Sequence, residues 1–257
     1  MAGIPVFAGA VVAAFAIQWV AFVPAYRLRS ERFFDLVGSL TFLSVTWALF
    51  YLASTQDRRA WLLAGMVTLW ALRLGAFLVA RIRREGTDQR FDPLKERFSA
   101  FLMVWTLQGL WVSVTAGAAW AAIGAESPAP LGAWAGAGVV VWAFGLVWEA
   151  VADEQKRRFR KDPDNEGRFI QSGLWRWSRH PNYFGEILVW AGVALTAAGA
   201  LRGWALLTLT SPLFVAVLLT RISGIPILDR RAEERWGNDP EYRKYRDHTP
   251  AVIPWRP

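Results

Sequence analysis

Long apolar blocks are the feature that most restricts what this chain can fold into. Each block is close to the length that crosses a bilayer, since about twenty helical residues span roughly 30 Å of hydrocarbon. Within lipid, only helices or closed barrels satisfy their own backbone hydrogen bonds. The sequence therefore predicts an all-α integral membrane protein. Its seven-transmembrane-helix bundle is expected at residues 4–26, 33–53, 61–80, 98–124, 131–151, 183–201 and 204–222.

The polar segments between the blocks differ in their content of Lys and Arg. Segments 27–32, 81–97, 152–181 and 221–257 hold three, six, eight and eight of these residues, and the alternate connections hold two, none and one. Basic connections stay in the cytoplasm. The pattern predicts an N-terminus outside and a C-terminus in the cytoplasm. Because the first block lacks a basic start and a cleavage site, we expect a retained helix rather than a signal peptide.

Composition excludes several classes of site. The chain has no cysteine and only two histidines, His180 and His248, which excludes disulfides and thiolate metal sites and makes a histidine metal centre unexpected. The net charge of +8 is attributed to topology and to anionic lipid headgroups, so membrane lipids are expected partners and nucleic acid is not. The excess of Arg over Lys, with abundant Ala, Gly and Trp, indicates a bacterial protein of the inner membrane.

Ionisable residues gather at the predicted cytoplasmic end of block 131–151. Glu149 and Asp153 are four residues apart, and Arg157 and Arg160 continue the same helical face. For the outer positions, a solvated helix with ion pairs between neighbouring turns explains the pattern equally well. Glu149 lies inside an apolar stretch, where an acid is costly, so it is a candidate for function.

The motif WSRHPNYFGE, residues 177–186, leads into the sixth block. Pro181 suits the first turn of a helix, and the free N–H groups of that turn form an anion site, to which Arg179 and His180 add charge. Asn182 and Glu186 share a helical face and are candidates to bind ribose hydroxyls or an amide. The motif therefore predicts a phosphate or carboxylate site at the membrane boundary.

The C-terminal tail mixes charges with aromatic residues, including Trp236, Tyr242, Tyr245 and Trp255. Two structures are compatible with it. The first is an amphipathic helix in the membrane interface. The second is a segment that folds back and caps the cytoplasmic pocket. An anionic cofactor would then enter from the cytoplasm, and a hydrophobic substrate from the bilayer.

The N-terminal half contains two ionisable residues of interest. Arg73 lies within block 61–80 and needs a partner inside the bundle. Asp35 opens block 33–53, where it is either a helix-start residue that favours the dipole or a functional acid.

The stretches GLWRWSRHPNYFGE and RWGNDPEYRKYRDHTPAVIP, with ADEQKRRFRKDPDNEGRFIQSGLW upstream, resemble the membrane steroid 5-alpha-reductase family over residues 145–257. The resemblance implies a seven-helix bundle that binds NADPH on the cytoplasmic side and reduces the 4,5 double bond of 3-oxo-4-ene steroids or of similar enone lipids. In one membrane domain, residues 1–130 would face the lipid substrate and 131–257 the cofactor. The implied NADPH contacts are Glu149, Asp153, Arg157, Arg160, Arg179, His180, Asn182, Tyr183, Glu186, Arg235, Tyr242 and Tyr245.

A broader group shares the Arg-His-Pro-x-Tyr-x-Gly motif and a similar tail. These proteins are isoprenylcysteine and phospholipid methyltransferases, whose cofactor is S-adenosylmethionine. The stretch from Asp153 to Arg160 favours the reductase, because a 2′-phosphate and a diphosphate need cations that S-adenosylmethionine does not. Asn182 and the pair Gly185 and Glu186 also match the reductase version. The methyltransferase stays the alternative.

The catalytic residues of the steroid reductases are matched less closely. The family uses a Gln-Glu pair and a tyrosine to bind the 3-oxo group, whereas this chain places Asp35 and Trp70 near those positions. We expect Asp35 to donate a proton or hydrogen bond to the developing oxyanion if burial keeps it protonated, with Tyr26 as the second candidate. No obligate protein partner is predicted.

Overall fold

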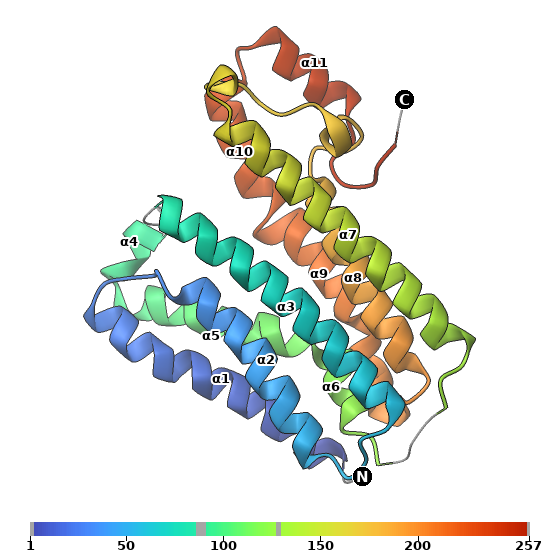
Figure 1. Ribbon diagram of the computed structural model, residues 1–257. Helices are drawn as coiled ribbons and strands as arrows, with labels where there is room; N and C mark the ends of the chain where they lie inside the picture. Colours follow the sequence, from blue (N-terminus) through green and yellow to red (C-terminus); the bar gives the residue numbers. More distant parts are fainter. Residues whose placement is uncertain (1–2, 86–90, 127–129, 256–257) are drawn as a thin grey trace. The chain divides into compact units, whose positions relative to one another are not determined.

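The computed structural model describes residues 3–85, 91–126 and 130–255 (Figure 1). These residues form helices and connecting segments, and no strand is assigned within the described ranges. The α-helices are α1 (Gly3–Arg27), α2 (Phe34–Leu52), α3 (Arg58–Glu85), α4 (Asp92–Lys95), α5 (Phe98–Thr115), α6 (Gly117–Ile123), α7 (Ala133–Lys161), α8 (Pro181–Ala198), α9 (Ser211–Val217), α10 (Ile225–Trp236) and α11 (Pro240–His248). The shorter elements are η2 (Pro163–Asn165), η3 (Gly173–Arg176), η4 (Gly203–Thr210) and the π-helical turn η5 (Leu218–Ile222).

Six helical stretches in the described ranges are long and apolar enough to cross a membrane, and the protein is an integral membrane protein. They are Ile4–Arg27, Phe34–Leu52, Arg58–Ala80, Phe98–Thr115, Ala133–Lys161 and Gly203–Trp236. The count of seven spans is not confirmed, because the predicted span 183–201 corresponds to α8, whose first two turns carry Asn182 and Glu186. The orientation of the termini stays a prediction.

Two predicted spans differ from the observed elements. The block 98–124 is divided into α5 and α6 at Ala116, next to Gly117, a residue type that weakens a helix. The last block continues as η4, α9, η5 and α10. At Ser211 the 3₁₀ helix η4 gives way to α9, one residue before Pro212, whose ring is accepted in a first helical turn.

The described chain divides into two compact units. The first comprises Met1–Gly136 and Val193–Ser211, and the second comprises Ala137–Gly192 and Pro212–Pro257. The predicted division of labour between 1–130 and 131–257 follows a similar boundary, except that residues 193–211 belong with the N-terminal helices. Whether these parts serve a lipid and a cofactor stays a prediction.

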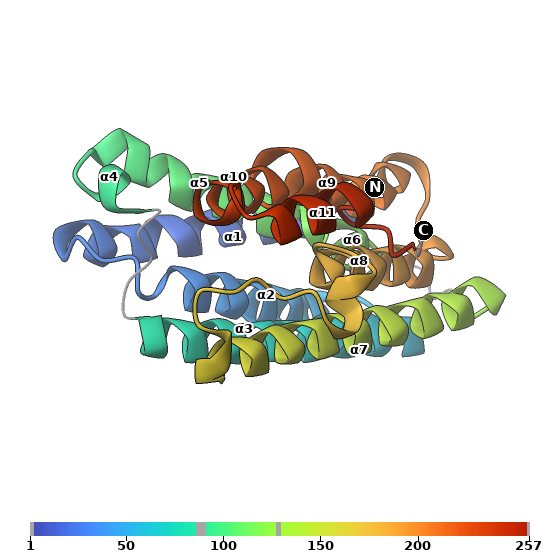
Figure 2. The ribbon, with the colours of Figure 1, turned by 90° about the horizontal axis from the view of Figure 1, so that it is seen from above.

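In the first unit, α2 packs between α1 and α3, and α1 also packs against α5 (Figures 1 and 2). Each of these contacts includes a side-chain hydrogen bond that suits an apolar setting, where polar groups need a partner. The Gln18 amide of α1 donates to Thr41 Oγ1 of α2 at 2.7 Å, and the Trp47 indole of α2 donates to Thr68 of α3 at 3.0 Å. These bonds give the helix pairs a defined register.

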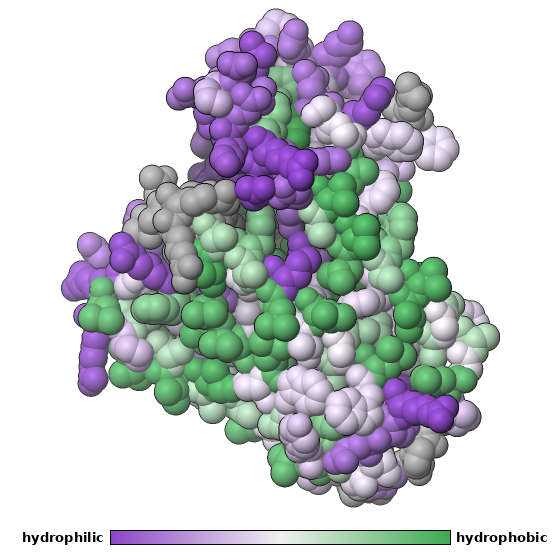
Figure 3. Space-filling model, viewed as in Figure 1, coloured by the Kyte–Doolittle hydropathy of each residue, from purple (hydrophilic) through white to green (hydrophobic). Residues whose placement is uncertain are grey.

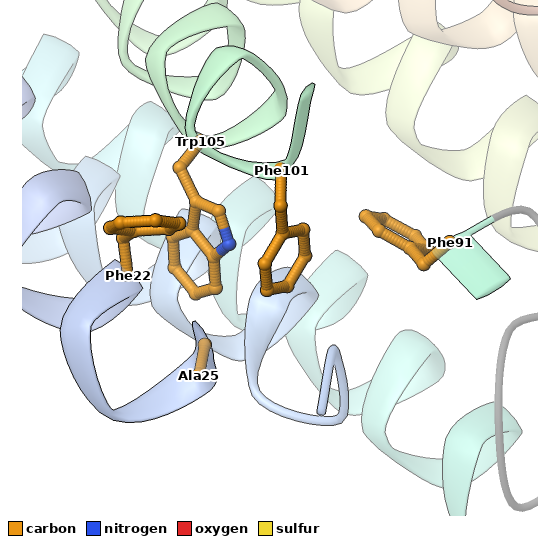
Figure 4. Packing of buried hydrophobic residues seen from close by; sticks show 5 residues of the cluster. All are labelled: Phe22, Ala25, Phe91, Phe101 and Trp105. Carbon is orange, nitrogen blue, oxygen red and sulfur yellow. The ribbon is translucent and has the colours of Figure 1, made fainter. Parts of the chain in front are cut away.

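An aromatic cluster forms the core at one end of the first unit. Phe22 and Ala25 of α1 meet Phe91, Phe101 and Trp105 there, and all five are buried (Figure 4). The rings pack edge to face, the arrangement preferred by aromatic quadrupoles, with the Phe22 and Phe101 centroids 5.8 Å apart. This apolar packing joins α1 to α5 together with one hydrogen bond outside the cluster, which the Trp19 indole of α1 donates to Thr106 Oγ1 of α5 at 3.0 Å.

In the second unit, α7 and α8 approach closely because glycines face each other. A Cβ on Gly185 of α8 would lie 2.7 Å from the Cβ of Glu149 on α7, and one on Gly145 of α7 would lie 2.7 Å from the carbonyl of Gly185. Gly192 meets the backbone of Trp142 in the same way. Small residues at such a contact let helix backbones approach, as membrane helix pairs do. The contact positions the start of α8 beside the end of α7.

Candidate functional site

A cavity of about 290 Å³ lies within the second unit. The end of α7, the segment before α8, and the helices α10 and α11 form its wall. Its lining residues are Lys156, Phe159, Arg160, Arg168, Phe169, Ile170, Trp175, Arg179, His180, Leu228, Asp229, Arg231, Ala232, Arg235, Trp236, Tyr242 and Tyr245. The wall thus combines many cations with aromatic rings and one carboxylate.

The segment before α8 is fixed to α7 by three contacts. The indole of Trp175 donates to the carbonyl of Ala152 at 3.0 Å, and Lys156 lies 4.4 Å above the Trp175 ring. One residue earlier, the backbone N–H of Leu174 donates to Gln155 Oε1 at 2.8 Å. Gly173 makes this turn with a positive φ of 61°, a conformation that other residues rarely adopt. These contacts bring the motif that follows to the cavity.

The C-terminal tail folds back on the same segment. The backbone N–H groups of Arg179 and His180 donate to the carbonyls of Pro250 and Ala251 at 2.9 and 3.0 Å. The Arg179 guanidinium adds a bond of 3.2 Å to the carbonyl of Thr249. Of the two structures compatible with the tail sequence, the second unit therefore shows the one in which the tail closes a pocket.

Asp229 of α10 contacts both Arg179 and His180, the two residues before Pro181 at the start of α8. Its carboxylate accepts from Arg179 Nη1 at 2.9 Å and lies 3.0 Å from His180 Nε2. A carboxylate bridging two cationic or potentially cationic groups keeps each of them in one position, because charge-assisted hydrogen bonds are short and strong. The pair joins α10 to the start of α8 at the centre of the cavity wall.

The wall of the cavity is mainly positively charged. The titratable side chains of the wall are Asp229, His180, two tyrosines and six cations. The cations are Lys156, Arg160, Arg168, Arg179, Arg231 and Arg235. Asp229 is the one carboxylate in this lining, and the carboxylate of Asp153, outside the lining, interacts electrostatically with Lys156. Arginine suits oxygen-rich anions because its planar fork matches phosphate geometry. The cavity is therefore built to receive more than one negative charge.

His180 is buried beside this charge. Burial lowers its pKa below the ordinary value, and the Asp229 carboxylate opposes that effect without reversing it. The ring stacks on Tyr183, with centroids 5.5 Å apart and planes 13° from parallel. Since Nε2 faces Asp229, the neutral ring carries its proton there. The other nitrogen, Nδ1, is buried and has no hydrogen-bond partner among the described residues.

The aromatic part of the wall centres on Phe169. Its ring lies 6.0 Å from Trp236, 5.3 Å from Tyr242 and 5.5 Å from Tyr245. The Tyr245 hydroxyl donates to the carbonyl of Trp175 at 2.5 Å, and burial raises the pKa of Tyr245, which keeps that hydroxyl protonated. Aromatic faces beside arginines offer a surface on which a planar base can stack.

The structure places half of the predicted cofactor residues in this wall and the other half outside it. The lining residues are Arg160, Arg179, His180, Arg235, Tyr242 and Tyr245. The residues outside the lining are Glu149, Asp153, Arg157, Asn182, Tyr183 and Glu186.

The residues outside the lining have other contacts. Asn182 donates to Asp153 Oδ1 at 3.2 Å, which joins α8 to α7. Arg157 forms a two-bond ion pair with Glu154 at 2.6 and 2.7 Å, as expected for a solvated helix face. Glu149 is buried against Gly185, so Glu149, Asp153 and Asn182 lie along the α7–α8 contact.

Several lining residues were not singled out from the sequence as site residues. Asp229, Arg168 and Phe169 are the most informative of them. Asp229 stands among charged neighbours in an amphipathic stretch, and nothing in its local pattern separates it from them. The basic and aromatic character of segment 168–169 is a weak signal that only proximity to the motif strengthens.

The three catalytic candidates lie in the first unit, in two different aromatic groups. Tyr26 packs against Phe22 and Phe98, with centroids 5.5 and 5.2 Å apart. Trp70 of α3 is buried against Phe42 of α2, with the ring centroids 5.0 Å apart. Phe42 lies two helical turns after Asp35 on α2. Asp35 is half-buried in the first turn of α2, and its carbonyl accepts from Ser39 at 3.2 Å. Their roles stay predictions.

Comparison with known proteins gives one family. Residues 21–249 match the model of the family described as protein of unknown function, DUF1295. No solved structure matches the chain.

Three curated proteins are similar to the chain. An uncharacterised protein of Schizosaccharomyces pombe is 25% identical over 225 residues, which cover 77% of this chain and 64% of that protein. The 3-oxo-5-alpha-steroid 4-dehydrogenase 1 of Bos taurus is 29% identical over 107 residues, 42% of this chain and 38% of the relative. A probable O-methyltransferase of Ustilaginoidea virens is 36% identical over 66 residues, 26% and 23% of the two chains. The chain covers less than two thirds of each relative.

Proposed function

From the premise that this chain belongs to the DUF1295 family, we propose that it is a membrane-bound oxidoreductase that uses NADPH to reduce an enone lipid. The 4,5 double bond of a 3-oxo-4-ene steroid is the substrate we propose to test first, because the bovine relative carries the name of a 3-oxo-5-alpha-steroid 4-dehydrogenase. The observation that carries the proposal is the cationic and aromatic cavity of the second unit.

The charge of the cavity fits the phosphates of NADPH. The 2′-phosphate and the diphosphate are oxygen-rich anions, and bidentate arginine pairing is the strongest recognition available for them. S-adenosylmethionine has no phosphate and carries a positive sulfonium, so a wall of six cations would oppose it. The wall therefore supports a phosphorylated dinucleotide over a sulfonium cofactor.

The size of the cavity indicates which part of the cofactor it would hold. At about 290 Å³ it is at the lower limit of ligand pockets, which begin near roughly 300 Å³. We assign it to the phosphate-bearing half of NADPH, with Arg160, Arg179 and Arg235 as the phosphate ligands. Phe169 and Trp236 would stack a planar base.

Asp229 would act as a positioning residue in this site. Its bonds to Arg179 and His180 hold both side chains before a ligand arrives. Pre-organised donors lose less conformational freedom on binding than mobile ones do. The carboxylate also fixes the orientation of the His180 ring through its contact with Nε2.

The reaction would need a hydrogen-bond donor from the chain. When bound, NADPH supplies the hydride that adds to the β carbon of the enone. Negative charge then develops on the carbonyl oxygen, and a donor in a dry site stabilises it. We propose Asp35 in its protonated form for this role, with Tyr26 as the alternative and Trp70 as part of the apolar wall. A proton added at the α carbon completes the reduction.

The hydrophobic substrate would reach the protein from the bilayer, and the soluble cofactor from the cytoplasm. The six apolar helices support a lipid environment for the first. The basic segments at one end support a cytoplasmic position for the second. A bacterial inner membrane is the location that we propose, on the composition of the chain.

A methyltransferase is the second candidate, and one finding favours it. The probable O-methyltransferase of Ustilaginoidea virens is 36% identical to this chain, although over only 66 residues. The name describes methyl transfer by that protein and says nothing of this chain. The charge of the cavity is the reason for placing this candidate second.

Ligand-dependent stability separates the two candidates. The protein, purified in detergent, is titrated with NADPH, NADH and S-adenosylmethionine while its thermal unfolding is followed. A ligand that binds only the folded state raises the apparent Tm by mass action. We expect NADPH to raise the Tm most and NADH less, because NADH lacks the 2′-phosphate. Stabilisation by S-adenosylmethionine alone would overturn the proposal.

A further inference from the structure

Three large apolar residues are exposed together in the second unit. Trp177 is 41% exposed, and Ile253 and Trp255 are each 71% exposed. The backbone N–H of Trp255 donates to the carbonyl of Trp177 at 3.2 Å, which holds the end of the tail beside the segment that precedes α8. None of the three lines the cationic cavity. We call Trp177, Ile253 and Trp255 the tail patch.

The position of the tail patch along α7 follows from a neighbouring hydrogen bond. The indole of Trp175 donates to the carbonyl of Ala152 on α7. Two residues of extended chain span at most about 7 Å, so the Cα of Trp177 lies within that distance of the Cα of Trp175. At this level α7 changes character. Val151 is its last large exposed apolar residue, and Glu154 begins an ion-paired surface with Arg157 and Arg158. The patch therefore lies where α7 passes from an apolar to a charged surface.

The surface around the tail patch shows the same transition. In the second unit, charged residues gather over α10 and α11 and apolar residues over α7 to α9 (Figure 3). A shallow hollow of about 530 Å³ adjoins Ile253 and Trp255, and its other walls are Asp247, His248, Thr249 and Pro250. Mainly apolar surroundings beside charged and polar residues suit the headgroup level of a bilayer, where tryptophan is enriched.

We propose that the tail patch is an anchor that seats the C-terminal segment in the headgroup region of the bilayer. The partner is the lipid surface itself, because the patch continues the level at which the membrane-crossing helix α7 becomes charged. The tail sequence predicted an amphipathic interfacial helix as one alternative. In the structure, the aromatic rings of α10 and α11 pack against Phe169; they belong to Trp236, Tyr242 and Tyr245. The residues that we place in the lipid are therefore those after α11.

The anchor would also support the cavity. Pro250 and Ala251, just before the patch, accept the backbone bonds of Arg179 and His180. Seating the tail in the bilayer would thus hold the residues that close the cavity wall. The inference concerns where the tail lies, and it does not depend on which cofactor the cavity binds.

The absence of cysteine in this chain allows a clean test. Ile253→Cys in the full-length protein is labelled with an environment-sensitive fluorophore and reconstituted into phosphatidylcholine and phosphatidylglycerol vesicles. A lipid with a nitroxide near its headgroup serves as the quencher. Asn238→Cys, in the exposed turn between α10 and α11, is the aqueous reference, and Phe144→Cys, exposed in the middle of α7, is the deep reference.

We expect the label at Ile253→Cys to be quenched by the shallow nitroxide, while the label at Asn238→Cys is not. Trp255→Ala in the Ile253→Cys background should reduce that quenching, and unchanged thermal unfolding would show that this variant is folded. Emission at Ile253→Cys that matches Asn238→Cys would overturn the proposal. An apolar emission without quenching would also overturn it, since a protein surface or a second copy would then cover the patch.

Discussion

The two units differ in how they bury polar groups. In the first unit, the fully buried polar side chains in the middle of its helices are neutral, such as Gln18 bonded to Thr41 and Thr46 bonded to Trp120. In the second unit, a carboxylate, an arginine and a histidine meet at the cavity wall, with Asp229 between Arg179 and His180 (the latter buried). The buried charges of the first unit, Glu31 and Arg59, lie at or near helix ends, where Glu31 pairs with Lys95 and Arg59 donates to the carbonyl of Pro130 at 2.7 Å. In the second unit the charges meet instead at the wall of a cavity.

This difference has an energetic basis. A charge inside an apolar environment is very costly unless it is paired, whereas a neutral amide or hydroxyl needs only one hydrogen bond. The second unit nevertheless collects six cations around a cavity that contains a single carboxylate. An anionic ligand would be attracted to this cationic lining, whereas the core cluster of the first unit consists of apolar and aromatic residues. The predictions below test whether the two units carry these separate roles.

The largest effect should come from the first unit. Asp35→Asn removes the proposed acid while keeping its size, so kcat with progesterone or testosterone should fall by about 100-fold or more. Binding of NADPH should change little, because Asp35 belongs to the other unit. Turnover is followed by NADPH oxidation, and binding by thermal shift.

Tyrosine variants identify the donor if Asp35 is not the acid. Tyr26→Phe removes the second candidate, and Tyr51→Phe, at an exposed position of α2, is the matched control. Full activity in Asp35→Asn with loss of activity in Tyr26→Phe would transfer the role to Tyr26. Full activity in all three variants would show that neither Asp35 nor Tyr26 is needed for catalysis.

The second prediction concerns phosphate recognition in the second unit. Arg179→Gln removes a charged donor from the cavity wall, and the dissociation constant for NADPH should rise by about ten- to 100-fold. Arg176→Gln is the control, since Arg176 is exposed nearby and does not line the cavity. Titration calorimetry measures both. An equal change in the two variants would mean that Arg179 acts only through overall charge.

The third prediction concerns the helix contact that supports the charged cavity. Gly185→Ala places a Cβ 2.7 Å from that of Glu149, and overpacking of this kind should lower the free energy of unfolding by about 1–3 kcal/mol. Gly136→Ala on α7 meets no atom within 4 Å and should leave stability unchanged or raise it by up to about 1 kcal/mol. Thermal unfolding in detergent compares them. Equal stability of both variants would show that α7 and α8 can separate.

The smallest expected effect is a pH dependence of the second unit. The pKa of His180 is lowered from 6.5 in the folded protein, chiefly by burial. As the pH falls below about 6.5, the unfolded chain takes up the proton first, so this contribution to stability is lost toward acid pH. His180→Gln should flatten the fall in Tm between neutral and acid pH, and His248→Gln, at an exposed position, should not. The same slope in both variants would exclude His180 as its source.

Much of the fold follows from local sequence, and local patterns also singled out half of the predicted cofactor residues as ones that prove to line the cavity. The helices α1 to α3 agree with their apolar blocks to within a few residues, because block length and hydrophobicity act on each helix separately. The motif at residues 177–186 likewise identified Arg179 and His180. Local spacing did not separate Arg157 from the residues of the cavity wall, and its helical face pairs it with Glu154; its role in cofactor binding stays a prediction.

The sequence by itself determined that this chain is a helical membrane protein with a basic, aromatic C-terminal region, because apolar length and charge are properties of consecutive residues. Only the tertiary structure decided that Asp229 meets Arg179 and His180, about fifty positions earlier in the chain. It also decided that the tail closes a cavity while its last residues stay exposed. Such contacts arise from helix packing and chain reversal, which bring distant residues together, and no local pattern encodes them.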